Sequence, residues 1–298
     1  MEIKRLDAAS ATGAAELFRA VQRSVLTTAA YLLHRESAMP ARARRLSLIA
    51  LDGGAVVGYG SAYLKWEGGS TDEARAWVAV RPGHRGRGLG TELAERVERH
   101  AIEAGARRLG TVVENDSEGA AFAIARGYQA TGADIVCSLA PDRLELPQRD
   151  GFEVASLDGL AGRERDLYGL WAEAGAFVPA GPAPTLEEWR HGMFESPLLE
   201  RSGSFTILDG DRRPVSLSWL LVDAERRQAE NEWTATVPRF RGQGLARLAK
   251  LHTINWAAEH GIREILTASD EDNIAMLELN RSLGYRRLWR RQWFARDV

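Results

Sequence analysis

Short apolar runs that enclose glycine-containing turns predict β-hairpins in both halves of the chain. In the first half, residues 47–51 and 55–59 enclose an Asp-Gly-Gly turn. In the second half, residues 204–208 and 215–219 lie on either side of an Asp-Gly pair. The hydrophobic pattern therefore predicts a sheet in each half.

Each hairpin is followed by a third β-rich run, a glycine-rich loop and an amphipathic helix. The β-rich runs lie at residues 76–80 and 232–237. After each loop, apolar residues recur at three- and four-residue spacing, as in a helix that packs one face against a sheet. They are Leu93, Val97 and Ala101 in the first half and Leu248, Leu251, Ile254 and Ala258 in the second. The pattern predicts an α/β fold with mixed central sheets that are flanked by helices.

The two halves also repeat one another in sequence, which indicates a tandem duplication. Residues 76–90 align with residues 232–246, and this alignment matches Trp77 with Trp233. Two prolines and mixed charges at residues 141–150 mark the boundary between the copies. We therefore expect two domains, at residues 1–145 and 146–298.

Composition restricts the class of protein. The 298 residues are 45% hydrophobic and 27% charged, which indicates a folded globular chain. The formal net charge of −2 gives no basic field for nucleic acid or an anionic membrane. Cys137 is the single cysteine, no histidines show metal-ligand spacing, and no apolar run approaches the ~18 residues of a membrane span. We expect a cytoplasmic protein without a bound metal, a membrane or a nucleic-acid partner.

The loop between the third strand and the helix is suited to phosphate. Glycines let the backbone approach an anion closely, and the free amides of the first helical turn point toward it. The loops read Arg-Gly-Arg-Gly-Leu-Gly at 85–90 and Arg-Gly-Gln-Gly-Leu-Ala at 241–246. Neither loop continues as a Walker sequence, and neither has the dinucleotide-binding spacing.

These loops resemble the acyl-CoA pyrophosphate motif of the GNAT (Gcn5-related N-acetyltransferase) superfamily, in its tandem two-domain form. Residues 273–285 resemble the second cofactor motif of that family, and residues 121–128 resemble a shorter version. The resemblance implies two GNAT-like domains and acetyl-CoA, or another acyl-CoA, as the cofactor. It implies these donor-binding residues: Val80, Arg85, Gly86, Arg87, Gly88, Gly90 and Thr91 in the first half, and Thr236, Val237, Arg241, Gly242, Gln243, Gly244, Ala246, Arg247, Asn273 and Asn280 in the second.

The resemblance also indicates which half catalyses. The family often takes the amine proton with a carboxylate on the strand before the loop, and Glu232 occupies that place where the first half has Ala76. The alternative for Glu232 is a solvated residue at a strand end, and that for Asn273 is a helix N-cap. Neither half carries the tyrosine that the resemblance expects as the thiolate acid, since Phe122 and Leu279 stand there. We expect the second half to catalyse and the first to be non-catalytic.

The sequence thus predicts an N-acetyltransferase that moves an acyl group from acyl-CoA directly to a primary amine of a small molecule in a ternary complex. Two alternatives stay open at this point. One is a catalytically silent acyl-CoA-binding or scaffold protein, and the other is an aminoacyl-tRNA-dependent transferase on the same fold. Both a monomer and a homodimer are compatible with the sequence.

Overall fold

The computed structural model describes residues 1–66, 71–114, 116–175 and 183–298. Internal contacts divide the chain into two compact units. The first comprises Met1–Asp134, the described part of Val178–Gly192, and Arg290–Val298; the second comprises the described part of Ile135–Phe177, and Met193–Trp289. The C-terminal segment therefore belongs to the unit that contains the N-terminus.

The first unit is built on a mixed sheet with strand order β1-β2-β3-β4-β5-β12. Its strands are β1 (Glu2–Arg5), β2 (Leu46–Asp52), β3 (Ala55–Leu64), β4 (Glu73–Val80), β5 (Arg108–Glu114) and, from Arg290 on, β12 (Arg286–Asp297). Strands β4 and β5 are parallel, whereas the other neighbours in this order are antiparallel.

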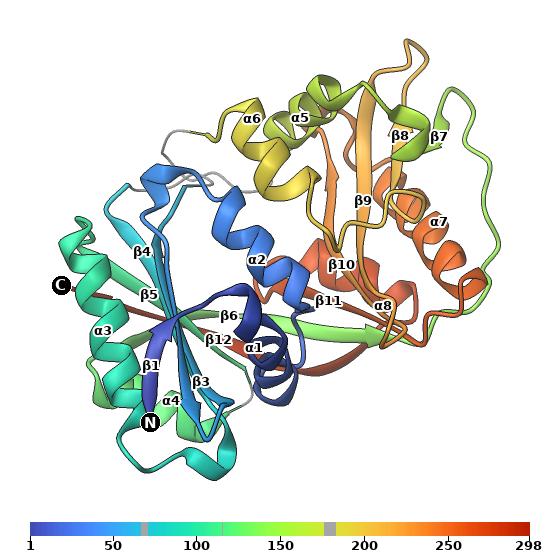
Figure 1. The fold of residues 1–298 in the computed structure, drawn as a ribbon. Coiled ribbons are helices and arrows are strands. Elements are labelled where there is room, and N and C mark those ends of the chain that lie inside the picture. Colours follow the sequence, from blue (N-terminus) through green and yellow to red (C-terminus); the bar gives the residue numbers. More distant parts are fainter. Residues whose placement is uncertain (67–70, 115, 176–182) are drawn as a thin grey trace. The chain divides into compact units, whose positions relative to one another are not determined.

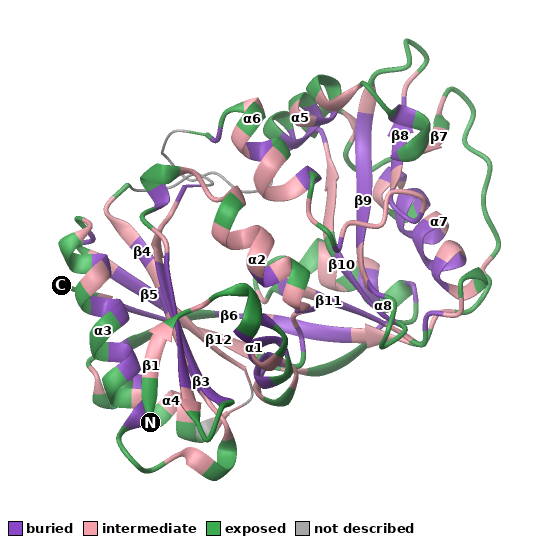
Figure 2. Cartoon of the chain, viewed as in Figure 1, coloured by how far each residue is buried: buried purple, intermediate pink, exposed green. Residues whose placement is uncertain are grey.

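Helices cover both faces of this sheet (Figure 1). They are α1 (Ala8–Val21) and α2 (Ala29–Ala38) on one face, and α3 (Leu89–Glu103) and α4 (Ser117–Ala125) on the other. Because side chains alternate along a strand, neighbours in β2 serve different cores: Ile49 packs with Phe18 of α1, and Ala50 packs with Leu93 of α3. Figure 2 shows the resulting buried layers. The short helix α6 (Leu186–Trp189) also belongs to this unit.

The second unit repeats the plan with strand order β6-β11-β10-β9-β8-β7. Its strands are β6 (Gln129–Leu139) from Ile135 on, β7 (Glu153–Ser156), β8 (Phe205–Leu208), β9 (Pro214–Asp223), β10 (Gln228–Thr236) and β11 (Glu264–Asp270). Its helices are α5 (Glu164–Glu173), α7 (Leu245–Glu259) and α8 (Ile274–Ser282). Leu251 and Ile254 of α7 pack against Leu220 and Ile265 of the sheet. The predicted mixed α/β fold class is confirmed.

In both units the central parallel strands pair over a short stretch and then separate. The pairing of β4 with β5 covers Glu73–Arg75, and that of β10 with β11 covers Gln228–Glu230. The loops that hold the glycines follow β4 and β10 directly, so each loop lies at the open end of a gap between two strands. A ligand that enters such a gap can bond to strand backbone that lacks a sheet partner.

One feature of the strand order was not predicted. Residues Arg291–Asp297 of β12 pair with Arg108–Glu114 of β5, so a strand that follows the second copy adds to the sheet of the first unit. The limits of 1–145 and 146–298, which were predicted from the two sequence copies, stay a prediction. Within the described residues, no helix is long and apolar enough to cross a membrane.

Candidate functional site

The first glycine-rich loop exposes its backbone as a phosphate site requires. Gly86 and Gly88 have φ of 72° and 82°, and an added Cβ at either position would meet nothing within 4 Å. Both positions therefore need glycine for their conformation, and both leave room above the backbone. Gly88 is also the N-cap of α3 and gives it no side-chain cap, so the amides of the first turn are available to a ligand.

The second loop has the same backbone but different surroundings. Gly242 and Gly244 have φ of 77° and 76°, and Gly244 precedes the first residue of α7. A guanidinium nitrogen of Arg149 lies 3.2 Å from the position of a Cβ on Gly244. Arg247 of α7 donates a hydrogen bond of 2.8 Å to Ser282. Together with Gly244, Arg149 and Arg247 line a cavity of about 520 Å3, so two cations border this helix N-terminus.

A cavity of about 610 Å3 lies in the first unit. It begins at the loop, where Arg85, Gly88 and Thr91 line it, and passes between the separated strands β4 and β5. At its other end it is lined by Gln22, which follows α1, and by Glu114, the last residue of β5. Its volume is in the range of small-molecule and cofactor sites.

The arginines that begin the two loops bind to the protein itself. Arg85 forms ion pairs of 3.0 Å with Asp116 and with Glu118 of α4. Arg241 donates hydrogen bonds of 3.1 Å to the carbonyl of Thr236 and 2.8 Å to the carbonyl of Ala174. Both side chains therefore hold the loop in shape, and the amides of the first turn of α3 and of α7 have no side-chain cap.

The other residues predicted to bind the donor fall into three groups. Exposed residues on the loops and first helical turns are Arg87, Thr91, Gln243 and Arg247. The half-buried or buried residues are Val80, Gly90, Thr236, Val237 and Ala246. Asn273 is the N-cap of α8, accepting a hydrogen bond of 3.2 Å from the amide of Met276. Asn280 is 1% exposed and donates a hydrogen bond to Ser269, while its Oδ1 has no partner among the described residues.

Glu232 lies on an irregularity in the second sheet. The register of β9 and β10 shifts between Asn231 and Trp233, which forms a β-bulge with Glu232 at its centre. The side chain is exposed, and it stands where the parallel pairing of β10 has just ended. In the first sheet, β3 and β4 run in continuous register through Ala76. The units therefore differ in the backbone as well as in the side chain at this place.

The bulge rests on buried polar groups that sequence reasoning missed. Lys250 of α7 is 1% exposed, and its Nζ lies 2.5 Å from Oδ1 of Asn231. Its ammonium also lies 4.9 Å from the ring centre of Tyr285. Burial lowers the pKa of Lys250 from 10.5 to about 7. The signal in the sequence was a lysine within the apolar face of a helix, at the place that Ala94 occupies in the first copy.

A second missed residue is Glu114 in the first unit. It accepts hydrogen bonds of 2.9 Å and 2.7 Å from the amide and the hydroxyl of Ser24, and one of 3.1 Å from the amide of Arg23. Burial raises its pKa above the ordinary value of a glutamate. Glu114 thus fixes the segment between α1 and α2 at the end of the cavity.

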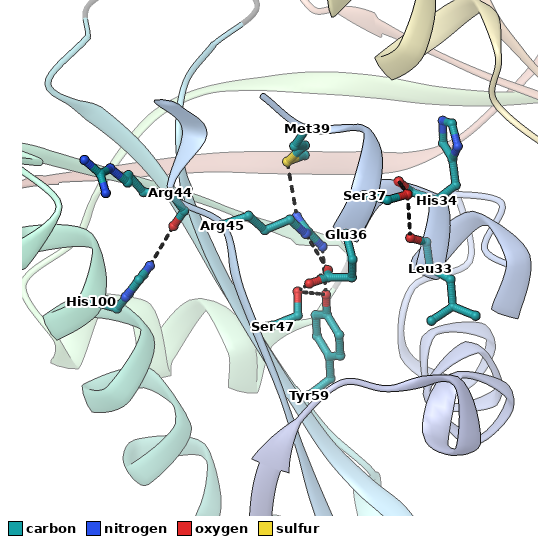
Figure 3. Close-up of polar contacts among 10 residues, drawn as sticks. All are labelled: Leu33, His34, Glu36, Ser37, Met39, Arg44, Arg45, Ser47, Tyr59 and His100. Atoms are coloured by element: carbon teal, nitrogen blue, oxygen red, sulfur yellow. Dashed lines mark hydrogen bonds and ion pairs between the residues drawn. The ribbon is translucent and has the colours of Figure 1, made fainter. Parts of the chain in front are cut away.

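A polar network holds α2 on the sheet next to this segment (Figure 3). Glu36 of α2 accepts hydrogen bonds of 2.5 Å from Arg45 and 2.7 Å from Ser47. Tyr59 of β3 lies 3.0 Å from the hydroxyl of Ser47 and 3.1 Å from Arg45. This network links α2 to β2 and β3. It therefore holds α2, the helix that follows the segment fixed by Glu114, at a defined position on the sheet.

Comparison with known proteins agrees with this architecture. The model of the acetyltransferase (GNAT) family matches residues 14–128 and 167–285. The chain therefore belongs to this family, whose members use acyl-CoA, and the predicted class, an N-acetyltransferase, is confirmed.

Individual relatives extend the match over most of the chain. A mycothiol acetyltransferase of Geodermatophilus obscurus is 29% identical over 272 residues, which cover 85% of this chain and 83% of that protein. One of Thermobispora bispora is 27% identical, covering 80% of each chain. Among solved structures, a tandem GNAT protein from the clavulanic acid biosynthesis pathway has a TM-score of 0.77 at 18% identity, covering 99% and 98% of the two chains. A GCN5-related N-acetyltransferase from Sphaerobacter thermophilus has a TM-score of 0.72 at 18% identity, covering 99% and 95%. The last two share the fold of both units.

Proposed function

We propose that the protein transfers the acetyl group of acetyl-CoA to a primary amine of a small molecule, and that the second unit catalyses the transfer. The observation that carries this proposal is the β-bulge of β10, which presents the exposed carboxylate of Glu232 beside the gap between β10 and β11. The mycothiol acetyltransferases among the relatives support a small-molecule acceptor.

The donor is held by the loop that begins at Arg241. The amides at the start of α7 bind the pyrophosphate, and Arg149 and Arg247 contribute positive charge at the same helix end. The pantetheine arm then enters the gap beyond Glu230 and Leu266, where the pairing of β10 with β11 has ended. This path brings the thioester to the bulge.

The chemistry at the bulge is a direct acyl transfer. The amine attacks the thioester carbonyl, a C–N bond forms, and the C–S bond breaks with its electron pair passing to sulfur. Glu232 accepts the proton that the amine loses, directly or through a water molecule. Ala76, at the same place in the first unit, cannot accept a proton.

The larger cavity lies in the first unit, whereas the bulge and Glu232 lie in the second. We assign catalysis to the unit with the bulge, because the reaction requires a proton acceptor and a cavity by itself supplies none. The first cavity is proposed as a second acyl-CoA site. Glu114 is the carboxylate at its far end, and it is the matched residue against which Glu232 is tested.

Calorimetric titration of acetyl-CoA into wild type, Gly88→Glu and Gly244→Glu tests the donor sites. Each substitution puts a side chain on a glycine with positive φ and a negative charge beside the pyrophosphate. We expect each variant to lose one of two sites. Thiol release from acetyl-CoA with an amine library is then expected to survive Gly88→Glu and Glu114→Gln and to be lost in Gly244→Glu and Glu232→Gln. The opposite pattern assigns catalysis to the first unit, and binding without turnover identifies a silent acyl-CoA-binding protein.

A further inference from the structure

We propose that Lys250 is the acid that protonates the CoA thiolate as it leaves the second unit. This inference rests on the proposed function, which needs such an acid because Leu279 stands where the family resemblance places a tyrosine. The position of the ammonium is the main argument. Its Nζ bonds to Asn231, the residue that precedes Glu232 in the bulge.

The apex of the gap between the strands lies at the same residue. The parallel pairing ends at Glu230 and Leu266, and beyond it the hydroxyl of Thr267 donates a hydrogen bond of 3.1 Å to the carbonyl of Asn231. The pantetheine arm of a donor in this gap ends at that apex, with its sulfur toward the bulge. Lys250 of α7 contacts Asn231 at this apex, and Glu232, the next residue, is exposed. The two groups are thus positioned to act on opposite partners of the same reaction.

Asn231 holds the ammonium in place through several bonds. Its Nδ2 donates hydrogen bonds of 2.9 Å to the hydroxyl of Ser218 and to the carbonyl of Trp219, which leaves Oδ1 facing Lys250. Thr234 donates a further hydrogen bond of 3.0 Å to Oδ1. An ammonium has three donors, and the bond to Asn231 uses one of them. A proton remains for a ligand atom.

Burial makes the proton of Lys250 easy to release, although the two groups that face it, Tyr285 and Cys137, favour the charged form. Tyr285 presents its ring to the ammonium, and its Oη is buried without a hydrogen-bond partner among the described residues. Cys137 of β6, also buried, is the other titratable group that interacts with it. With its pKa lowered by burial to about 7, Lys250 is a stronger acid than an ordinary thiol with a pKa of about 8.5. Proton transfer to the thiolate is therefore favourable.

The protons balance over one turnover. The amine gives one proton to Glu232, and Nζ of Lys250 gives one to the sulfur, which leaves as the thiol. The neutral Lys250 then recovers a proton from Glu232 through solvent after the products leave. The first copy cannot use this route, because Ala94 occupies the position of Lys250.

The test uses thiol release from acetyl-CoA with hydroxylamine, a small amine that is unprotonated at neutral pH. General acids contribute about 10²-fold or more to rate. We expect Lys250→Met to lower kcat by about 10²-fold while the Kd of acetyl-CoA stays unchanged. In wild type, kcat falls as pH rises and Lys250 loses its proton, and Lys250→Met loses this alkaline limb. Lys65→Met, which removes a lysine paired with Glu73 in the other unit, is expected to match wild type.

A second variant keeps the lysine. Asn231→Asp places a carboxylate against Nζ, stabilises the ammonium and is expected to move the alkaline limb to higher pH. A Lys250→Met enzyme with wild-type kcat, or one that is slower but keeps the alkaline limb, overturns the assignment. If Glu232→Gln is inactive in that case, the proposed function stands without Lys250. No thiol release by wild type overturns the proposed function itself, and this inference with it.

Discussion

Replacing Lys250 with methionine is expected to change how the stability of the protein depends on pH. The folded protein holds this amine at 1% exposure, and burial lowers its pKa from 10.5 to about 7. The unfolded chain therefore binds more protons than the folded one between about pH 7 and pH 10.5. In this window the free energy of unfolding rises with pH, and below pH 7 the cost of burying the charge is fully present. Methionine fills a similar space without a charge.

The magnitude follows from the two pKa values. At about 1.36 kcal/mol for each pKa unit, burying the charged form costs about 5 kcal/mol. Most of this cost is still present at pH 7, and by pH 9 the folded lysine is neutral while the unfolded one is charged. The difference in unfolding free energy between wild type and Lys250→Met should then change by about 2 kcal/mol between pH 7 and pH 9. Asn231 keeps its hydrogen bond from Thr234 in the variant, which limits the loss there.

Urea unfolding at pH 5, 7 and 9, followed by tryptophan fluorescence, measures this difference. Lys65→Met controls for the loss of one lysine, because it removes a partly exposed side chain. We expect the advantage of Lys250→Met over wild type to be about constant from pH 5 to pH 7 and to decrease toward pH 9. An advantage that is the same at all three values would refute the reasoning, because it would show that the buried amine titrates as it does in water.

Three further predictions concern stability and binding. Glu98→Ala is expected to lower the free energy of unfolding by about 3–5 kcal/mol, because Glu98 is buried and pairs with Arg126 and Arg296. Glu92→Ala removes an exposed ion pair on the same helix and should lower it by less than about 1 kcal/mol. Urea unfolding measures both changes. Deleting residues 290–298 is expected to abolish the cooperative unfolding of the first unit, whereas deleting Val298 alone should preserve it. Asn273→Ala removes an N-cap and is expected to lower the free energy of unfolding by about 1 kcal/mol. The Kd of acetyl-CoA, measured by calorimetry, is expected to stay unchanged. Weaker binding would show instead that Asn273 contacts the donor.

The fold was predictable because it depends on patterns that repeat locally. Apolar alternation around short turns fixed the hairpins, and the positive φ values of Gly88 and Gly244 explain why both loops carry glycine at these positions. Glu232 was predicted as a candidate because an acidic residue stands at this position of the aligned repeat. Its exposure on a bulge was not predictable, because a bulge depends on the register between two strands and cannot be recognised from the sequence of one strand.

Other features depend on contacts between distant parts of the chain. Lys250 reads as one polar residue in a helix, and its burial appears only when Asn231 and Tyr285 are placed around it. Glu114 ends an ordinary strand, and its partner Ser24 lies far away in the sequence. The pairing of β12 with β5 was unpredictable for the same reason, since the repeat gives no order for strands contributed by different copies.

The pairing of β12 with β5 has a consequence for synthesis of the chain. A ribosome makes Arg108–Glu114 long before Arg291–Asp297, so the backbone edge of β5 waits for its antiparallel neighbour until the residues of β12 have been made. An unpaired strand edge can recruit other chains, which makes the nascent protein vulnerable to aggregation during this interval. The same dependence penalises a stop codon that falls before Arg291. Loss of the final strand removes support from the N-terminal unit, although every other strand of its sheet has been translated.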